Sequence, residues 1–238
     1  MPGRPGPQPR HRSAIGLLPR PTVVRVQPTA TAAASRWRAT PASLARLLVG
    51  LWLFGTGDAL IVSAALGNAP WTVLAQGLSL NTPLSIGTAT QVVSALVLCG
   101  WIPLRERPGL GTVCNALLIG VAIDVMLPLL PAGDGLPARA AALGGGVLLV
   151  GLGSGLYLSA RLGPGPRDGW MTGLHRVTGR PLPLLRGAIE TTALAGGWLL
   201  GGTVGVGTVV FALAIGPAVA VGIRVVDARL QPVGAPRA

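Results

Sequence analysis

The chain has 238 residues, of which 50% are hydrophobic and only 11% are charged, and its mean hydropathy is +0.61. Soluble domains carry about a quarter charged residues, so this composition excludes an ordinary soluble domain and indicates a membrane protein. The net charge of +12 comes from arginine alone, because the chain has no lysine. Since no aromatic and basic nucleic-acid-binding signature accompanies the charge, the anionic face of a lipid bilayer is the expected partner, and nucleic acid is not.

Residues 1–43 are rich in Pro, Arg, Ala and Thr and show no sustained apolar period. This composition predicts a disordered cytoplasmic tail, unless part of it is an over-long reading of the gene. The stretch 15–18 is too short to form the apolar core of a secretory signal. A second short cytoplasmic tail is expected over residues 227–238.

Six apolar runs follow the first tail, each close to the roughly 20 residues that cross a hydrocarbon core of about 30 Å. Backbone groups in lipid must be satisfied within the segment, so these runs predict helices and not strands. They cover residues 44–66, 86–104, 110–130, 139–160, 182–201 and 206–226. The sequence therefore predicts an all-α membrane protein with six transmembrane helices.

The placement of arginine predicts the orientation of these helices, because basic loops stay on the cytoplasmic side. Eight arginines lie between residues 4 and 46, which puts the N-terminus inside, and the loop after the first span, 66–85, has no charge and fits the outside. Arginines return in the loops expected to be inside, and a lone Arg139 in an outside loop is the exception. Both termini are expected to be cytoplasmic.

An internal repeat runs through the chain at a constant spacing of 96 residues. Segment 66–82 is similar to segment 162–179, and the match extends without a gap over some seventy positions. The matched pairs in these two segments are Leu66/Leu162, Gly67/Gly163, Pro70/Pro166, Gly77/Gly173, Leu78/Leu174 and Thr82/Thr178. Residues 44–130 form the first repeat and residues 139–226 the second, each with three spans. Because three is an odd number, the second copy must insert upside down, as in inverted-repeat transporters.

Each repeat also contains a short helical segment, Pro70–Leu80 in the first and Pro166–Val177 in the second. About a dozen residues at 1.5 Å each reach about 18 Å, which is too short to span a bilayer. Each short helix therefore lies either at the membrane interface or re-enters the membrane. Proline at the first position starts each helix, and Gly67 and Gly163 supply the turn before it. The matched glycines Gly77 and Gly173 complete this structural motif.

Four ionisable groups fall within predicted spans, where burial in lipid is costly and marks functional candidates. Asp58 and Asp124 are acids in the first and third spans, and Asp124 is expected near Gln91 or Asn115. Arg186 and Glu190 lie four residues apart in the fifth span, so they share a helix face and can pair. A neutralised pair that holds helices together is the alternative to a substrate-binding or coupling role.

Arg167 and Asp168 open the second short helix. The helix dipole disfavours a cation at this end and favours an acid, so Asp168 is expected to cap the helix. Arg167 then needs an anionic partner, which is Glu190, Asp168, a lipid phosphate or a substrate. These two residues complete the candidates for substrate binding or coupling: Asp58, Asp124, Arg167, Asp168, Arg186 and Glu190.

Several kinds of chemistry have no support in the sequence. Cys99 and Cys114 lie in apolar runs without metal-ligand spacing, and His175 has no second histidine nearby, so no metal site is expected. No serine–histidine–acid set and no phosphate-binding loop is present. We therefore expect no enzyme activity and no cofactor.

Several motifs resemble those of the YczE/YitT-like family of bacterial multi-pass membrane proteins, whose biochemical activity is not established. They read Gly-Pro-Arg-Asp-Gly at 165–169, Pro-Gly-Leu-Gly-Thr at 108–112 and Gly-Gly-Thr-Val-Gly-Val-Gly-Thr at 201–208, with Asn115, Asp124 and Glu190. The resemblance covers residues 44–226 and implies a bacterial inner (plasma) membrane location. In the first repeat the family usually has an acid after Pro-Trp, where this chain has Thr72.

Two hypotheses of function follow from these patterns. The inverted repeat and the buried acids favour a small-molecule transporter, with a lipid bilayer and a small solute as partners. A scaffold or regulatory membrane protein without transport activity is the alternative. A polar cavity at the repeat interface, lined by the acids, would favour the first; acids sealed in salt bridges would favour the second. The oligomeric state and the substrate stay open.

Overall fold

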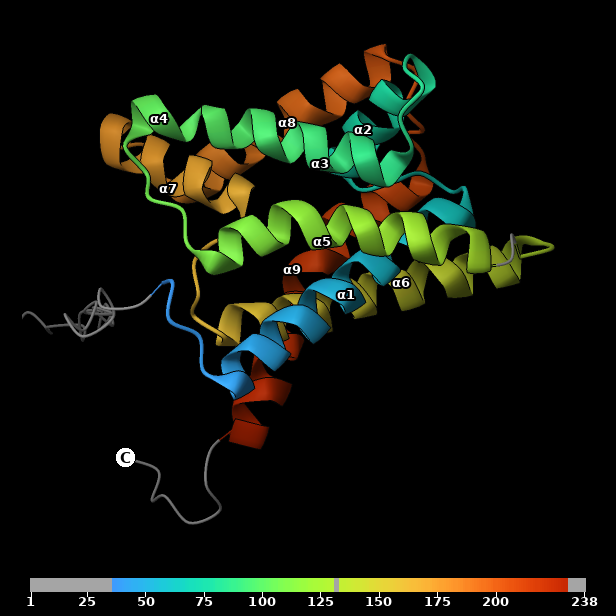
Figure 1. Cartoon of the computed structure of the whole chain (residues 1–238). Coiled ribbons are helices and arrows are strands. Elements are labelled where there is room, and N and C mark those ends of the chain that lie inside the picture. The colour runs from blue at the N-terminus through green and yellow to red at the C-terminus, as the bar shows by residue number, and fades with distance from the viewer. Residues whose placement is uncertain (1–35, 131–132, 231–238) are drawn as a thin grey trace, which may run out of the picture. The chain divides into compact units, whose positions relative to one another are not determined.

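The computed structural model describes residues 36–130 and 133–230, and all regular structure in these residues is helical (Figure 1). Of the predicted tails, 1–43 and 227–238, residues 1–35 and 231–238 lie outside the described residues. The helices are α1 (Pro41–Ala64), α2 (Pro70–Leu80), α3 (Ile86–Cys99), α4 (Trp101–Leu104), α5 (Leu110–Met126), the 3-10 turn η2 (Leu127–Leu129), α6 (Leu136–Ser159), α7 (Pro166–Thr178), α8 (Leu182–Leu199) and α9 (Val206–Leu230).

Five segments of the described chain are long and apolar enough to cross a membrane, which confirms an all-α membrane protein. They are Pro41–Ala64, Ile86–Leu104, Leu110–Leu129, Leu136–Ser159 and Val206–Ala228. The sixth predicted span forms α8, a helix of 18 residues. It is not among the five apolar spans, and Arg186 and Glu190 make it more polar than the others.

The two halves of the chain have the same order of elements. Helices α2 and α7, α3 and α8, and α5 and α9 each begin 96 residues apart. The turns before the short helices match as well: Ala65 and Arg161 are left-handed, with φ of 50° and 55°. Gly67 and Gly163 have φ of 112° and 122°, in a region where a side chain is strained, so the predicted glycine turn is confirmed in both halves.

Helices α1 and α6, the first of each half, cross at two pairs of glycines. A Cβ built on Gly57 would lie 2.6 Å from the carbonyl oxygen of Gly146, and one on Gly50 would lie 2.8 Å from that of Gly153. Small residues allow this close backbone approach between membrane helices. The contact moves backward along α6 as it advances along α1, so the two helices run antiparallel. Gly50 and Gly146, and likewise Gly57 and Gly153, are 96 residues apart.

The turn of each half binds the last long helix of the other half. The N–H of Gly207, in α9, donates to the carbonyl oxygen of Leu66 at 2.7 Å. The N–H of Gly111, in α5, donates to the carbonyl oxygen of Leu162 at 2.8 Å. These two bonds join residues at equivalent positions of the repeat, so the halves exchange the same contact.

The short helices pack beside α3 and α8, and α3 also contacts α5 of the group formed by α1, α5, α6 and α9 (Figure 1). Helix α2 contacts α3 and α8, and α7 contacts α3, α4 and α8. Two tryptophans fix α7: the Trp101 indole donates to the carbonyl oxygen of Pro166 at 2.8 Å, and the Trp170 indole donates to that of Val97 at 2.6 Å. The two short helices therefore have defined positions against these neighbouring helices.

The matched glycines of the short helices, Gly77 and Gly173, are both buried but pack differently. A Cβ on Gly77 would lie 2.6 Å from the carbonyl oxygen of Gly197, so α2 touches the backbone of α8. A Cβ on Gly173 would lie 3.1 Å from its nearest neighbour, which is the side chain of Leu104. The physical reason is Trp101, which stands at the position of Gly197 and whose ring packs under α7. Gly173 therefore does not share the close backbone contact of Gly77.

Candidate functional site

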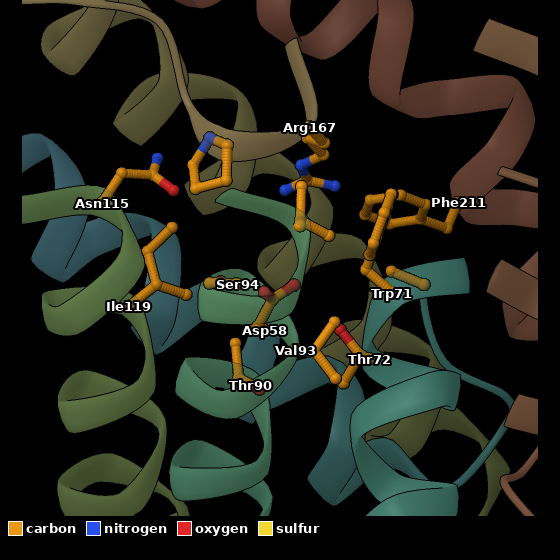
Figure 2. Close-up of a pocket in the computed structure, with 13 residues that line it drawn as sticks. Asp58, Trp71, Thr72, Thr90, Val93, Ser94, Asn115, Ile119, Arg167 and Phe211 are labelled. Atoms are coloured by element: carbon orange, nitrogen blue, oxygen red, sulfur yellow. The ribbon is translucent and has the colours of Figure 1, made fainter. Parts of the chain in front are cut away.

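A first cavity of about 50 Å³ lies where α1, α2, α3 and α5 meet the start of α7 (Figure 2). Asp58 is the acidic residue in its lining, and Arg167 is the basic residue. The remaining lining residues are Ala69, Trp71, Thr72, Thr90, Val93, Ser94, Val97, Asn115, Ile119, Pro166 and Phe211. This cavity combines one carboxylate, one guanidinium and several hydroxyl groups in an otherwise apolar wall.

A second cavity of about 170 Å³ lies among α1, α6, α7, α8 and α9. Arg186 and Glu190 from α8 and Asp168 from α7 give it more charge than the first. Trp71, Arg167 and Phe211 line both cavities, so these three side chains form the wall between them. The remaining lining residues are Phe54, Val150, Ser154, Tyr157, Leu158, Met171, Ile189, Ile215 and Val219.

The two cavities are lined by equivalent positions of the repeat. At a spacing of 96 residues, Asp58 corresponds to Ser154, and Trp71 corresponds to Arg167. The other equivalent pairs, first cavity then second, are Thr72/Asp168, Thr90/Arg186, Val93/Ile189, Ser94/Glu190 and Ile119/Ile215. The same pocket is therefore built twice, and its two copies share a wall.

The first turns of both short helices point their amide ends at this shared wall. Pro70 and Pro166 occupy the first helical positions of α2 and α7, directly before Trp71 and Arg167. A helix N-terminus carries about half a positive charge and unsatisfied N–H groups. Two such ends therefore add positive potential at the place where Arg167 lies.

The first turn of α7 lies beside the middle of α1. Helix α6 ends beside the beginning of α1, where Arg46 donates to the carbonyl oxygen of Ser159 at 3.5 Å. Further along the chain, the guanidinium of Arg167 lies over the ring of Phe54, with 5.4 Å to its centroid. Arg46 and Phe54 are eight residues apart, about 12 Å along a helix. The chain thus returns to the middle of α1 before α7 starts.

Arg167 is held by an aromatic ring and not by an acid. Its cation–π contact with Phe54 fixes the guanidinium between the two cavities. Among the described residues no carboxylate lies within ion-pair distance of it, so neither Glu190 nor Asp168 is its partner. Arg167 shares the first cavity with Asp58 and the second cavity with Tyr157. Arg167 and Glu190 therefore line the same cavity, but they do not form the predicted ion pair.

Asp58 is buried, with 6% of its surface exposed, yet it makes no hydrogen bond to the part of the chain that the structure describes. Thr72, Thr90 and Ser94 line the same cavity and supply hydroxyl groups to its wall. A buried carboxylate without a hydrogen bond is costly, so Asp58 is a candidate for a functional role.

Asp168 does not cap α7, contrary to the prediction. The helix has no side-chain cap at Gly165, and the Tyr157 hydroxyl donates to Asp168 Oδ2 at 3.2 Å. Tyr157 comes from α6 and is buried, so the bond links α7 to the second cavity wall. The dipole argument places an acid at this end correctly, but the acid faces the cavity instead of the backbone.

Arg186 and Glu190 form the predicted pair, with 3.0 Å between Arg186 Nε and Glu190 Oε1. Both side chains are partly exposed, at 53% and 31%, and both line the second cavity. Each charge is therefore already compensated by its neighbour on the same helix face.

Asp124 lies apart from the two cavities and binds the start of α3. Its Oδ1 accepts from the N–H of Gly87 at 2.8 Å, and its Oδ2 accepts from the hydroxyls of Ser85 and Thr88. An acid at a helix N-terminus stabilises the helix. Asn115 lines the first cavity and Gln91 bonds to the carbonyl oxygen of Leu117, so the predicted proximity of either to Asp124 gives no bond.

Sequence reasoning missed four residues of the site. Trp71 has a buried indole nitrogen without a partner among the described residues, and Phe54, Phe211 and Tyr157 form the aromatic walls around Arg167. The repeat contained a signal for Trp71, because it stands at the position of Arg167. The other aromatic residues lie within apolar runs, where nothing in the sequence distinguishes them from packing residues.

Comparison with known proteins places the chain in a family without an assigned activity. Residues 42–224 match a family described as "Family of unknown function (DUF6198)". An uncharacterized protein of Haemophilus influenzae is 41% identical over 197 residues, which cover 82% of this chain and 90% of the relative. The uncharacterized membrane protein YczE of Bacillus subtilis is 35% identical over 170 residues, 70% of this chain and 79% of YczE.

A third relative, the uncharacterized protein YyaS of Bacillus subtilis, is 26% identical over 164 residues, 67% of this chain and 82% of YyaS. No solved structure matches. The predicted resemblance to YczE-like proteins is thus confirmed. The chain, a helical membrane protein, belongs to the family of unknown function DUF6198.

Proposed function

We propose that the protein is a small-molecule transporter or permease with six spans, arranged as two inverted repeats in a bacterial inner (plasma) membrane. Both termini are cytoplasmic, and α8 is the sixth span. The protein is not an enzyme, and its partners are the lipid bilayer and a small solute. The observation that carries this proposal is the pair of equivalent cavities that share a wall of Trp71, Arg167 and Phe211.

The inverted arrangement is supported by the antiparallel crossing of α1 and α6. Two equivalent helices that run in opposite directions are what opposite insertion of the two copies requires. The exchanged bonds from Gly111 and Gly207 to the turns of the other half relate the copies in the same way. Helices α2 and α7 are then re-entrant helices whose N-terminal ends meet near the middle of the membrane.

The proposal of transport is supported by the wall of Trp71, Arg167 and Phe211 that the two cavities share. Each cavity is lined mainly by one copy of the repeat, and opposite insertion gives each its own side of the membrane. In the proposed cycle, a solute passes from one cavity to the other when Trp71, Arg167 and Phe211 rearrange. Rocking of one repeat against the other around a central site is the usual way such proteins alternate access.

The scaffold alternative predicts acids sealed in ion pairs. Glu190 fits that expectation, because Arg186 neutralises it. Asp58 does not, since it is buried in a cavity wall and forms no hydrogen bond or ion pair with the described chain. The balance favours transport, and Asp58 and Arg167 are the residues to test.

The proposal is tested by flux. A comparison of metabolites between a deletion strain and the wild type nominates solutes, and purified protein in proteoliposomes is then assayed with each. We expect uptake by the wild type, and at least a tenfold loss in Arg167→Gln. Arg180→Gln, on an exposed residue after α7, serves as the matched control and retains uptake. No flux of any nominated solute would favour the scaffold. Unchanged flux in Arg167→Gln would contradict a role of the shared wall in transport.

A further inference from the structure

We infer that the first cavity binds a compact zwitterion, a solute with one ammonium group and one carboxylate, as in an amino acid. The inference deepens the proposed function and rests on it. Its basis is that Asp58 and Arg167, two opposite charges, line one small cavity while neither is held in an ion pair by the described chain.

The anionic end of the solute has a defined place beside Arg167. The guanidinium is oriented by Phe54 and offers its donors in a planar fork that suits a carboxylate. Pro166 begins α7 and Pro70 begins α2, directly before Arg167 and Trp71, so the first turn at the amide end of each helix lines the cavity. The buried Trp71 indole nitrogen is a further N–H donor without a partner in the described residues. Discontinuous helices in transporters hold substrate carboxylates with such ends.

The cationic end has an equally defined place at Asp58. This carboxylate belongs to a residue with only 6% of its surface exposed, accepts no hydrogen bond from the described chain, and lines the cavity together with the hydroxyls of Thr72, Thr90 and Ser94. An ammonium carries three donors and no acceptor. A carboxylate and hydroxyl oxygens are the acceptors that such a group needs.

Both ends are needed to explain the cavity. A simple anion at Arg167 would face the like charge of Asp58, and a simple cation at Asp58 would face Arg167. Since an unpaired charge in a buried site is costly, a solute with both charges satisfies two groups that a single charge leaves unpaired. In the second cavity Arg186 already pairs with Glu190, and Asp168 with Tyr157, so the same argument does not apply there.

Binding to the purified full chain in lipid nanodiscs tests the inference. The probes are glycine, β-alanine and γ-aminobutyrate, which separate the two charges by increasing distances, with acetate and methylammonium as probes of one charge each. We expect saturable thermal stabilisation by at least one zwitterion. Acetate and methylammonium should bind about 10- to 100-fold more weakly, because each lacks one charged hydrogen-bonding group.

Substitutions then assign the two ends. Asp58→Asn should weaken binding of the zwitterion about 10- to 100-fold. It should strengthen acetate binding, because it removes the like charge that a simple anion would face. Arg167→Gln should weaken both, while Arg167→Lys should retain part of the affinity, which separates lost charge from misfolding. Asp134→Asn and Arg180→Gln, at exposed positions outside the cavities, are the matched controls and should bind as the wild type does.

Each other outcome has a defined meaning. Acetate as effective as the zwitterions would show an anion site, methylammonium as effective would show a cation site, and no stabilisation by any zwitterion would show another ligand class; each overturns the inference. Saturable zwitterion binding without flux of that solute in proteoliposomes would leave the inference standing and contradict the transport proposal. Arg167-dependent flux of acetate, without flux of any zwitterion, would support the transport proposal and overturn the inference.

Discussion

The two halves of the protein share one backbone plan but differ in the chemistry that they place around their cavities. In the second half, Asp168, Arg186 and Glu190 stand where the first half has a threonine, a threonine and a serine. Arg167 of the second half likewise corresponds to Trp71, whereas at Asp58 the difference is reversed, because Asp58 corresponds to Ser154. Asp168, Arg186 and Glu190 are paired or hydrogen-bonded, whereas Asp58 and Arg167 form no hydrogen bond or ion pair with the described chain.

This difference teaches which features belong to the fold and which to one site. Features present in both halves, such as the proline helix starts and the glycine turns, are required by the architecture. Features present in one half only, such as Asp58 and Arg167, are candidates for function. Mutations that separate these two classes can break or sharpen the comparison.

The largest effect is expected at the crossing of the two halves. A Cβ on Gly146 would lie 2.7 Å from the carbonyl oxygen of Gly57, so Gly146→Leu must push α1 and α6 apart. Overpacking of this kind costs about 3 kcal/mol in the free energy of unfolding. Gly144→Leu, in the same helix with nothing within 4 Å of its Cβ, is the control. Equal thermal unfolding of the two variants in detergent would contradict the crossing.

A smaller effect is expected at Asp124, which the first half has and the second replaces by Ala220. Asp124→Asn removes a charge from the start of α3 and weakens its bonds to Gly87 and Ser85. We expect a loss of about 1–2 kcal/mol in stability, with transport retained. Thermal unfolding measures the loss of stability and proteoliposome flux measures transport, with Asp134→Asn as the control. If Asp124→Asn is as stable as the wild type but has no flux, Asp124 takes part in transport.

Trp101 tests how the second short helix is held. Its equivalent in the second half is Gly197, which packs directly on the backbone of α2. Trp101→Phe keeps an aromatic ring but removes the bond to the carbonyl oxygen of Pro166, so we expect a loss of about 1 kcal/mol in stability. Chemical unfolding measures it. A loss within error of zero would mean that the tryptophan acts through shape alone.

The smallest effect is expected at the pair on α8. Arg186 and Glu190 are partly exposed, and such pairs contribute about 0–1 kcal/mol. Arg186→Gln combined with Glu190→Gln should therefore unfold close to the wild-type temperature. If Glu190→Gln alone leaves proteoliposome flux unchanged, Glu190 has no part in the mechanism. A loss of several degrees in the double variant would instead indicate a buried pair that holds the helices together.

Much of the fold could be predicted because it depends on local sequence. All six apolar runs form helices, and Pro70 and Pro166 start the short helices, since proline suits the first helical position. The i, i+4 spacing of Arg186 and Glu190 placed them in contact for the same reason. The repeat spacing alone also identified which positions are equivalent.

Equivalence in sequence did not always mean equivalence in packing. Gly77 and Gly173 match in the repeat, but only Gly77 lies against the backbone of a neighbouring helix. What separates them is the residue on the facing helix, which is Gly197 for α2 and Trp101 for α7. A match between two segments contains no information about the partners that each segment meets, so Gly173 could not be assigned from the repeat.

The site could be predicted only in part, because it depends on contacts between distant segments. Asp58 and Arg167 were recognised as unusual, but their meeting in one cavity follows from the return of the chain to mid-α1 before α7. Tyr157 takes Asp168 as a partner only because α6 passes beside α7. Asp124 binds the start of α3 through tertiary packing, 37 residues from Gly87, which no local pattern contains.

The most direct test of the account is the orientation of the two halves. Thr82 and Thr178 occupy equivalent positions after the two short helices. In a chain with Cys99 and Cys114 replaced by serine, Thr82→Cys should react with a membrane-impermeant maleimide in intact spheroplasts. Thr178→Cys should react only after permeabilisation. Reaction of both cysteines from the same side would contradict the inverted arrangement and the transport site built on it.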